Sequence, residues 1–179
     1  MERNFPDALA HTLQFEGGWS NNPNDPGGAT MKGITQRTYN NYLGRQASQD
    51  ELRNISDADV AAIYRKLYWN ECLGDELADG LDFALFDAAV NAGPREASRL
   101  LQRVVGVPAD GVLGPKSLDA INDYVAEQGL PKLIDAYTDA RQSFYRLLPT
   151  YVNFGEGWRK RADEVAKVAR DLSQNNSVV

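Results

Sequence analysis

Apolar side chains recur at helical spacing along most of the chain, which predicts a mainly α-helical protein. The first such run is Phe5, Ala8, Leu9 and Leu13, and it predicts a helix from about residue 4 to Glu16. The glycines that follow favour the left-handed conformation in which helices end. Later helices are expected at about 35–43, 56–69, 81–91, 95–105, 115–127, 131–148 and 158–172. Gly44 should end the helix at 35–43, and Ser48 with Glu51 should form a capping box that starts a short helix.

One predicted helix has no continuous polar face. Residues 81–91 are apolar on nearly every side, interrupted by Asp82, Asp87 and Asn91, and such a helix belongs in the centre of a core. We expect the two aspartates to be structural, paired with arginine or with backbone donors. Asn91 needs a hydrogen-bond partner, so it either caps the turn at Gly93 or contacts a substrate.

The pattern changes between the first two predicted helices. Residues 19–34 are rich in Asn, Pro, Asp and Gly, a composition typical of turns and short strands. We therefore expect a small β-hairpin or an irregular loop there. The length of this segment and its density of polar groups favour a functional loop over a plain surface connection.

Two carboxylates frame this loop. Glu16 is expected in the last turn of the first helix, where the negative end of the helix dipole disfavours a charged carboxylate, and Asp25 follows in the polar segment. One protonated and one ionised carboxyl group are the pair that hydrolyses glycosidic bonds. The alternatives are a solvated acid at a helix end for Glu16 and a turn cap for Asp25.

Composition limits the class of protein. The length of 179 residues suits one domain, or one domain with a small subdomain, and 42% hydrophobic residues can form a core. A formal net charge of -6 argues against general nucleic-acid binding. The single cysteine, Cys72, excludes a disulfide within the chain, and with the single histidine, His11, it makes a weak nucleophile–base pair. We expect neither a metal nor an organic cofactor.

The chain shows no targeting or membrane signal. Its first residues lack a basic start followed by a long apolar run, and no segment approaches the roughly 20 apolar residues of a membrane span. We expect a monomer made in the cytoplasm without a signal peptide and without membrane insertion. If its substrate lies beyond the inner membrane, a holin or an export system must give it access.

Several spaced motifs resemble one enzyme family. The run from Glu16-Gly-Gly-Trp19 through Asp25-Pro-Gly-Gly-Ala-Thr30 to Gly33-Ile-Thr35 resembles the signature of glycoside hydrolase family 108, the N-acetylmuramidases. Further along, similar segments are Phe86–Gly93, Leu101–Lys116 and Gly157–Arg161. The family includes phage endolysins and bacterial muramidases linked to protein export, so the resemblance implies a lysozyme-like fold and an enzyme acting at the cell wall.

The resemblance implies cleavage of the β-1,4 bond between N-acetylmuramic acid and N-acetylglucosamine in peptidoglycan. Glu16 becomes the general acid, Asp25 the base or electrostatic stabiliser, and Thr30 the residue that orients the attacking water. The Glu-Asp-Thr order also resembles that of phage lysozymes that invert the anomeric centre. In this chain Thr30 lies one position closer to Asp25 than the threonine lies to the aspartate in those lysozymes. The sequence leaves open whether the anomeric configuration is retained or inverted.

The same resemblance suggests a division of the chain. Residues 1–93 form the catalytic part, residues 94–172 a helical peptidoglycan-binding region packed on the same domain, and residues 173–179 a flexible tail. Aromatic rings pack on the C–H faces of sugars, so Trp19, Tyr68 and Trp69 are candidate sugar platforms beside Asn91; core packing is the alternative for each ring.

Two other functions compete with hydrolysis by two carboxylates. A lytic transglycosylase uses one catalytic glutamate and leaves an anhydro product, and the presence of Asp25 argues against it. A non-catalytic peptidoglycan-binding protein would not need the acid, the loop and the threonine together.

Overall fold

The computed structural model describes residues 4–21 and 28–175. It confirms the predicted class: the described chain is mainly α-helical, with one small two-stranded antiparallel sheet. Contacts divide it into two compact units. The N-terminal unit is Pro6–Lys66, and the C-terminal unit is Met1–Phe5 with Leu67–Val179. The predicted boundary at residue 93 therefore stays a prediction.

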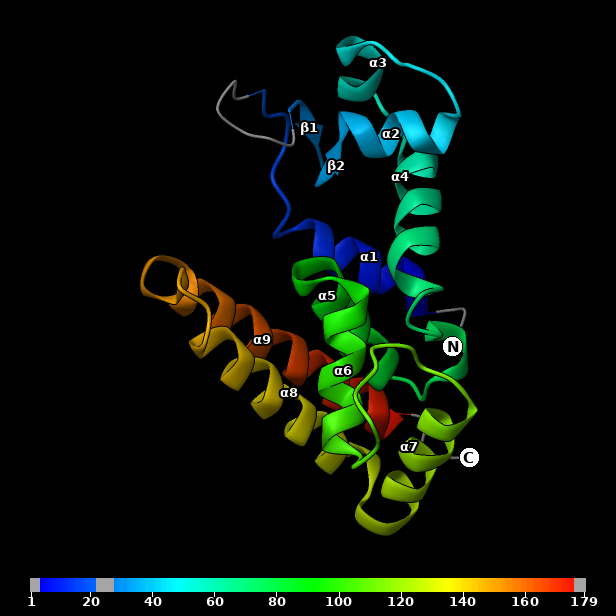
Figure 1. Cartoon of the computed structure of the whole chain (residues 1–179), viewed down its shortest axis with the longest axis vertical. Coiled ribbons are helices and arrows are strands. Elements are labelled where there is room, and N and C mark those ends of the chain that lie inside the picture. Colours follow the sequence, from blue (N-terminus) through cyan, green and yellow to red (C-terminus); the bar gives the residue numbers. More distant parts are fainter. Residues whose placement is uncertain (1–3, 22–27, 176–179) are drawn as a thin grey trace. The chain divides into compact units, whose positions relative to one another are not determined.

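In its described residues, the N-terminal unit contains the hairpin and four helices. Its elements are α1 (Phe5–Leu13, of which Phe5 belongs to the other unit), β1 (Thr30–Met31), β2 (Ile34–Thr35), α2 (Gln36–Leu43), α3 (Gln49–Arg53) and α4 (Asp57–Tyr64) (Figure 1). Local chemistry explains the ends of α2. The Thr35 hydroxyl accepts from the Thr38 backbone N–H at its start, and Gly44 ends it in the left-handed conformation.

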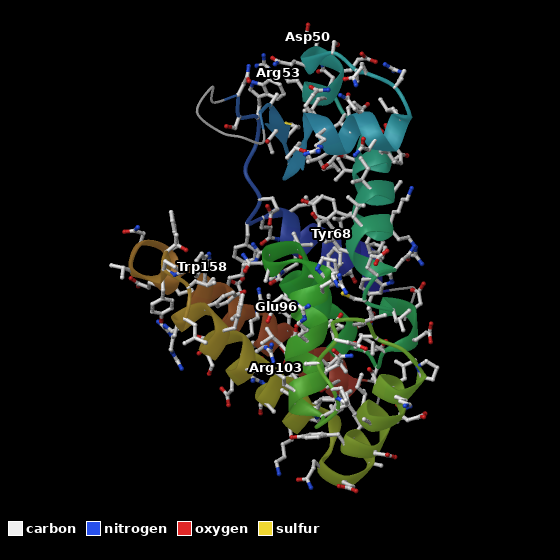
Figure 2. The ribbon with its side chains drawn as sticks, viewed as in Figure 1. Asp50, Arg53, Tyr68, Glu96, Arg103 and Trp158 are labelled. Atoms are coloured by element: carbon white, nitrogen blue, oxygen red, sulfur yellow. The ribbon has the colours of Figure 1, made fainter. Side chains whose placement is uncertain are left out.

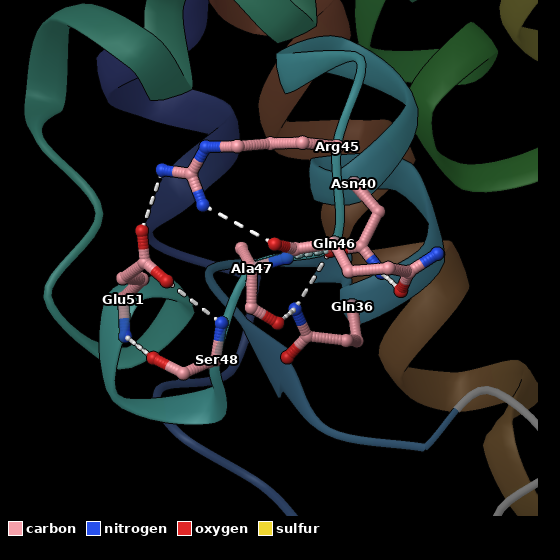
Figure 3. A network of polar contacts seen from close by, with 7 residues as sticks. All are labelled: Gln36, Asn40, Arg45, Gln46, Ala47, Ser48 and Glu51. Carbon is pink, nitrogen blue, oxygen red and sulfur yellow. Dashed lines mark hydrogen bonds and ion pairs between the residues drawn. The ribbon is translucent and has the colours of Figure 1, made fainter.

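A polar network joins α2 to α3 (Figure 3). Ser48 and Glu51 form the expected capping box, each side chain bonding to the backbone of the other. Arg45 donates to Glu51 over 2.6 Å, and with the Ser48 backbone N–H this lowers the pKa of Glu51 to about 2. Asn40 accepts from the Ala47 backbone N–H over 2.9 Å, so the connection is held at both ends.

The C-terminal unit is almost wholly helical. Its elements are a π-helical segment η2 (Arg65–Trp69, continuing α4 across the unit boundary), a 3₁₀ turn η3 (Gly74–Glu76), α5 (Leu81–Ala92), α6 (Pro94–Val104), α7 (Pro115–Gln128), α8 (Leu130–Arg146) and α9 (Tyr151–Asn175) (Figure 1). In the described part of the chain, every helix is too short or too polar to span a bilayer.

Helix α5 is the core of this unit, as its apolar pattern predicts. Every residue from Leu81 to Ala89 is buried. Helices α6, α8 and α9 pack against it. A helix enclosed in this way must also satisfy its own polar side chains, and Asp87 is the most demanding of them.

Asp87 is completely buried between two arginines. It accepts from Arg141 of α8 over 2.6 Å and from Arg161 of α9 over 2.9 Å. Burial alone would raise the pKa of Asp87, but the two guanidinium groups outweigh burial and hold it below the usual range. The predicted structural role of Asp87 is thus confirmed, and its carboxylate joins three helices.

The largest differences from the predicted boundaries lie in three helices. Helix α1 ends at Leu13 rather than at Glu16, because backbone N–H groups of Gln14 and Phe15 bond three residues back in tightened turns. The helix starting after Ser56 changes to π-helical geometry at Arg65. Helix α9 begins at Tyr151 rather than at Trp158 and runs to Asn175, so that residues 173–175 of the expected tail are helical; residues 176–179 lie outside the described part.

Removing the Asp87 charge should destabilise the protein strongly. In Asp87→Asn two buried guanidinium groups lose their counter-ion, and we expect a loss of about 3–5 kcal/mol in the free energy of unfolding. Urea unfolding followed by circular dichroism measures this loss. The matched control is Asp135→Asn, which removes an exposed partner of Arg170 and should cost less than about 1 kcal/mol. Equal losses in the two variants would contradict the role given to Asp87.

Asp82 should make the protein less stable as the pH rises. Burial raises the pKa of Asp82 to about 6, against donors from Asn4, Gly80 and Phe83 that favour its charged form. Between about pH 4 and pH 6 the folded state therefore keeps a proton that the unfolded state has released, and stability falls as pH rises, by at most about 1.4 kcal/mol per pH unit. Asp82→Asn should flatten this part of the curve in urea titrations; curves parallel to the parent's would refute it.

Candidate functional site

Glu16 lies just beyond the first helix. It sits in a bend after α1 and is half-buried. Because α1 ends at Leu13, Glu16 is outside the last helical turn, and the prediction that the helix dipole acts on its carboxylate is wrong. Its surroundings come instead from the β-hairpin of the same unit.

The hairpin has a two-residue turn. Thr30 pairs with Thr35 and Met31 with Ile34, which leaves Lys32 and Gly33 between the strands. Both turn residues have positive φ, 48° at Lys32 and 74° at Gly33. This is the type I′ geometry that suits the twist of a hairpin, and glycine adopts it without strain.

The turn packs directly against Glu16 and Tyr64. A Cβ atom at Gly33 would lie 3.0 Å from Glu16 Oε2 and 2.5 Å from Tyr64 Oη. Tyr64, at the end of α4, also donates its hydroxyl to the Lys32 carbonyl over 2.8 Å. The absence of a side chain at Gly33 therefore brings the turn backbone, the Glu16 carboxylate and the Tyr64 hydroxyl together.

The other two predicted catalytic residues are less fully described. Asp25 lies outside the described residues. Thr30 is half-buried in β1, where its backbone pairs with Ser20, and its hydroxyl donates to the Gly28 carbonyl over 3.3 Å. The roles of Asp25 and Thr30 stay predictions.

Trp19 is half-buried beside α3 in the same unit. The guanidinium carbon of Arg53 lies over its ring, 5.7 Å from the centroid (Figure 2 labels Arg53). Such a cation–π contact orients the indole. The sugar-platform prediction for Trp19 is compatible with this partly exposed position.

Trp69 is a core residue, and its prediction as a sugar platform does not fit the structure. Its side chain is fully buried, and its ring makes edge contacts with Phe5 at 5.4 Å and Phe86 at 5.6 Å between centroids. Its indole N–H donates to Asp75 over 2.8 Å. No ring face is left for a ligand. Tyr68, which Figure 2 labels, is by contrast half-buried and remains a candidate.

Asn91 has a polar partner that the sequence did not reveal. It is half-buried near the end of α5, and its Oδ1 accepts from the Tyr145 hydroxyl over 2.7 Å. Tyr145 in turn accepts from Arg141 Nε over 2.5 Å. The position of Asn91 is thus tied to the buried Asp87 network, while its contact with substrate stays a prediction.

Two further kinds of site were considered among the described residues: a metal site and a reactive thiolate. Among residues 4–21 and 28–175, no group of three or more His, Cys, Asp or Glu side chains is arranged to hold a metal ion. Burial raises the pKa of the Cys72 thiol to about 12, so it stays protonated at neutral pH. Cys72 is therefore a packing residue rather than a nucleophile.

Sequence reasoning missed the role of Tyr64 beside Glu16. Helical periodicity places Tyr64 on a buried face but gives no partner for its hydroxyl. The turn-rich composition of residues 19–34 gave a small hairpin as one expectation, but composition does not show which side chains pack on its turn.

The chain matches two family models and a solved structure. The family model described as glycosyl hydrolase 108 matches residues 9–93, and the model described as a predicted peptidoglycan domain matches residues 96–163. The solved structure of Brucella abortus SagA is 36% identical, with a TM-score of 0.85, over 99% of this chain and 100% of that chain. The chain belongs to glycosyl hydrolase family 108. No curated protein matches it.

Family 108 membership confirms the predicted lysozyme-like fold and makes the chain a glycoside hydrolase. The family 108 match contains Glu16, the hairpin and Tyr64, and the second match supports peptidoglycan as the substrate. The two matches meet near residue 94, whereas the contacts divide the chain after Lys66.

Alanine at Gly33 should disturb both stability and activity. The substitution places a methyl group against Glu16 and Tyr64 in a left-handed backbone, and we expect a loss of about 1–3 kcal/mol together with slower hydrolysis of cell walls. Gly44→Ala is the matched control: its φ is 67°, but a Cβ there meets no atom within 4 Å. If both variants lost activity equally, close packing at Glu16 would not be the cause.

Proposed function

We propose that this family 108 protein is an N-acetylmuramidase that hydrolyses the β-1,4 bond between N-acetylmuramic acid and N-acetylglucosamine. The observation that carries the proposal is the half-buried Glu16 carboxylate packed against the Lys32–Gly33 turn, within the segment matched by the family 108 model. A carboxylate fixed by neighbouring backbone is suited to deliver a proton along one direction.

In this mechanism Glu16 is the general acid. Its proton passes to the glycosidic oxygen as the bond to the anomeric carbon breaks, and the leaving sugar departs as an alcohol. Asp25 stays ionised and either activates a water molecule or stabilises the oxocarbenium-like transition state. Thr30 orients that water through its hydroxyl. Water supplies the hydroxyl group of the new reducing end and returns a proton to the site.

The groups around Glu16 restrict its motion. Gly33 brings backbone within contact distance of the carboxylate, and the Tyr64 hydroxyl fixes the turn through the Lys32 carbonyl. Small displacements of a catalytic group reduce rates sharply, so this packing is part of the catalytic design.

Trp19, Tyr68 and Asn91 are proposed to contact the glycan strand. The partner is peptidoglycan, and the site of action is the cell wall, as the second family match supports. The proposal includes a monomeric enzyme. It reaches the wall with the help of a holin, as in phage lysis, or of an export system, as in protein secretion.

Replacing Glu16 should abolish hydrolysis without abolishing wall binding. Glu16→Gln keeps the size of the side chain but cannot donate the proton, and we expect the rate of reducing-end release from purified walls to fall about 10²- to 10⁴-fold. Glu127→Gln, an exposed glutamate on α7, is the matched control and should keep the parent rate. An undiminished rate in Glu16→Gln would remove Glu16 from the mechanism.

Mass spectrometry of the products separates hydrolysis from the competing reaction. Hydrolysis leaves reducing N-acetylmuramic ends, whereas a lytic transglycosylase leaves anhydromuramic ends. Anhydro products from the parent protein would replace the hydrolase proposal, and wall binding without any cleavage would favour a binding protein.

A further inference from the structure

An aromatic row leads from the core to solvent at one end of the α8–α9 pair. Tyr145, Trp158 and Phe154 follow one another, with ring centroids 5.3 Å and 5.9 Å apart. Tyr145 is 2% exposed, Trp158 is half-buried, and Phe154 is 56% exposed. Figure 2 shows Trp158 near the connection between the two helices. The outer end of the row thus offers ring surface to a ligand.

The inner end of the row is polar and firmly held. Tyr145 receives a hydrogen bond from Arg141, which is itself paired with the buried Asp87, and donates to the Asn91 oxygen. Since that oxygen is engaged, the group that Asn91 offers to a ligand is its amide NH₂, a hydrogen-bond donor. Ring surface and an amide donor therefore belong to one connected arrangement, all within the C-terminal unit.

We propose that Phe154 and Trp158, with the Asn91 amide, form a carbohydrate platform that holds the amino-sugar chain of peptidoglycan. The rings pack against the C–H faces of a pyranose, and the amide donates to an acetamido carbonyl oxygen. The proposal rests on the proposed function for its polymer, and it assigns strand binding to residues apart from the catalytic carboxylates.

Two neighbouring residues distinguish sugar stacking from plain apolar docking. Leu147 and Val152 lie in and beside the same connection and are 83% and 92% exposed. They are apolar but carry no ring. A lipid surface or a protein partner would use them together with Phe154, whereas a sugar needs the flat ring.

The test compares Phe154→Ala with Leu147→Ala in the full chain. Binding to purified walls and to glycan strands stripped of peptide is measured by sedimentation, in the Glu16→Gln background that leaves the polymer intact. We expect Phe154→Ala to weaken binding about five- to tenfold to both polymers, and Leu147→Ala to stay within about twofold of the parent. Thermal unfolding should be nearly unchanged in both, because both side chains are exposed.

Three outcomes would overturn the platform. Equal weakening by Leu147→Ala means general apolar docking to a lipid or protein surface. Weakening on intact walls alone means recognition of peptide rather than sugar. Unchanged binding in Phe154→Ala means that the ring does not contact the strand. Full cleavage by Glu16→Gln would instead defeat the catalytic proposal, and binding at low temperature would still test the platform.

Discussion

One buried carboxylate organises the C-terminal unit. Asp87 on α5 cannot remain ionised in an apolar interior without partners, so the fold must bring Arg141 of α8 and Arg161 of α9 to it at once. The consequence reaches the surface, because Arg141 also holds Tyr145, and Tyr145 holds Asn91. The polar end of the proposed carbohydrate platform is therefore set by the electrostatics of the core.

The N-terminal unit depends on a different constraint, the close approach of backbone to side chains. A Cβ at position 33 would collide with the Tyr64 hydroxyl and crowd the Glu16 carboxylate. Glycine therefore has two roles at this position: it adopts the positive φ of the turn, and it leaves space for the carboxylate of the proposed acid. Each unit holds its own functional groups by interactions inside that unit: the proposed acid in the N-terminal unit, and the Phe154 and Trp158 rings of the proposed carbohydrate platform in the C-terminal unit.

The sequence predicted best where the determinants are local. The Ser48–Glu51 capping box and the glycine end of α2 are as expected, because both depend on residues a few positions apart. It failed at α9, where Gly155 and Gly157 lower helix propensity, yet the helix begins at Tyr151. There Gly155 is buried against the Tyr151 ring, and α8 lies along the helix, so packing outweighs propensity.

By itself the sequence determined the helical class, the turn-rich segment after the first helix, the family signature and Glu16 as the candidate acid, because periodicity, turn chemistry and motif spacing are properties of neighbouring residues. Only the tertiary structure decided that Trp69 is core, that Tyr64 stands beside Glu16, and which arginines neutralise Asp87. Those contacts join residues tens of positions apart. Their pairing follows from how helices pack, which no local pattern encodes.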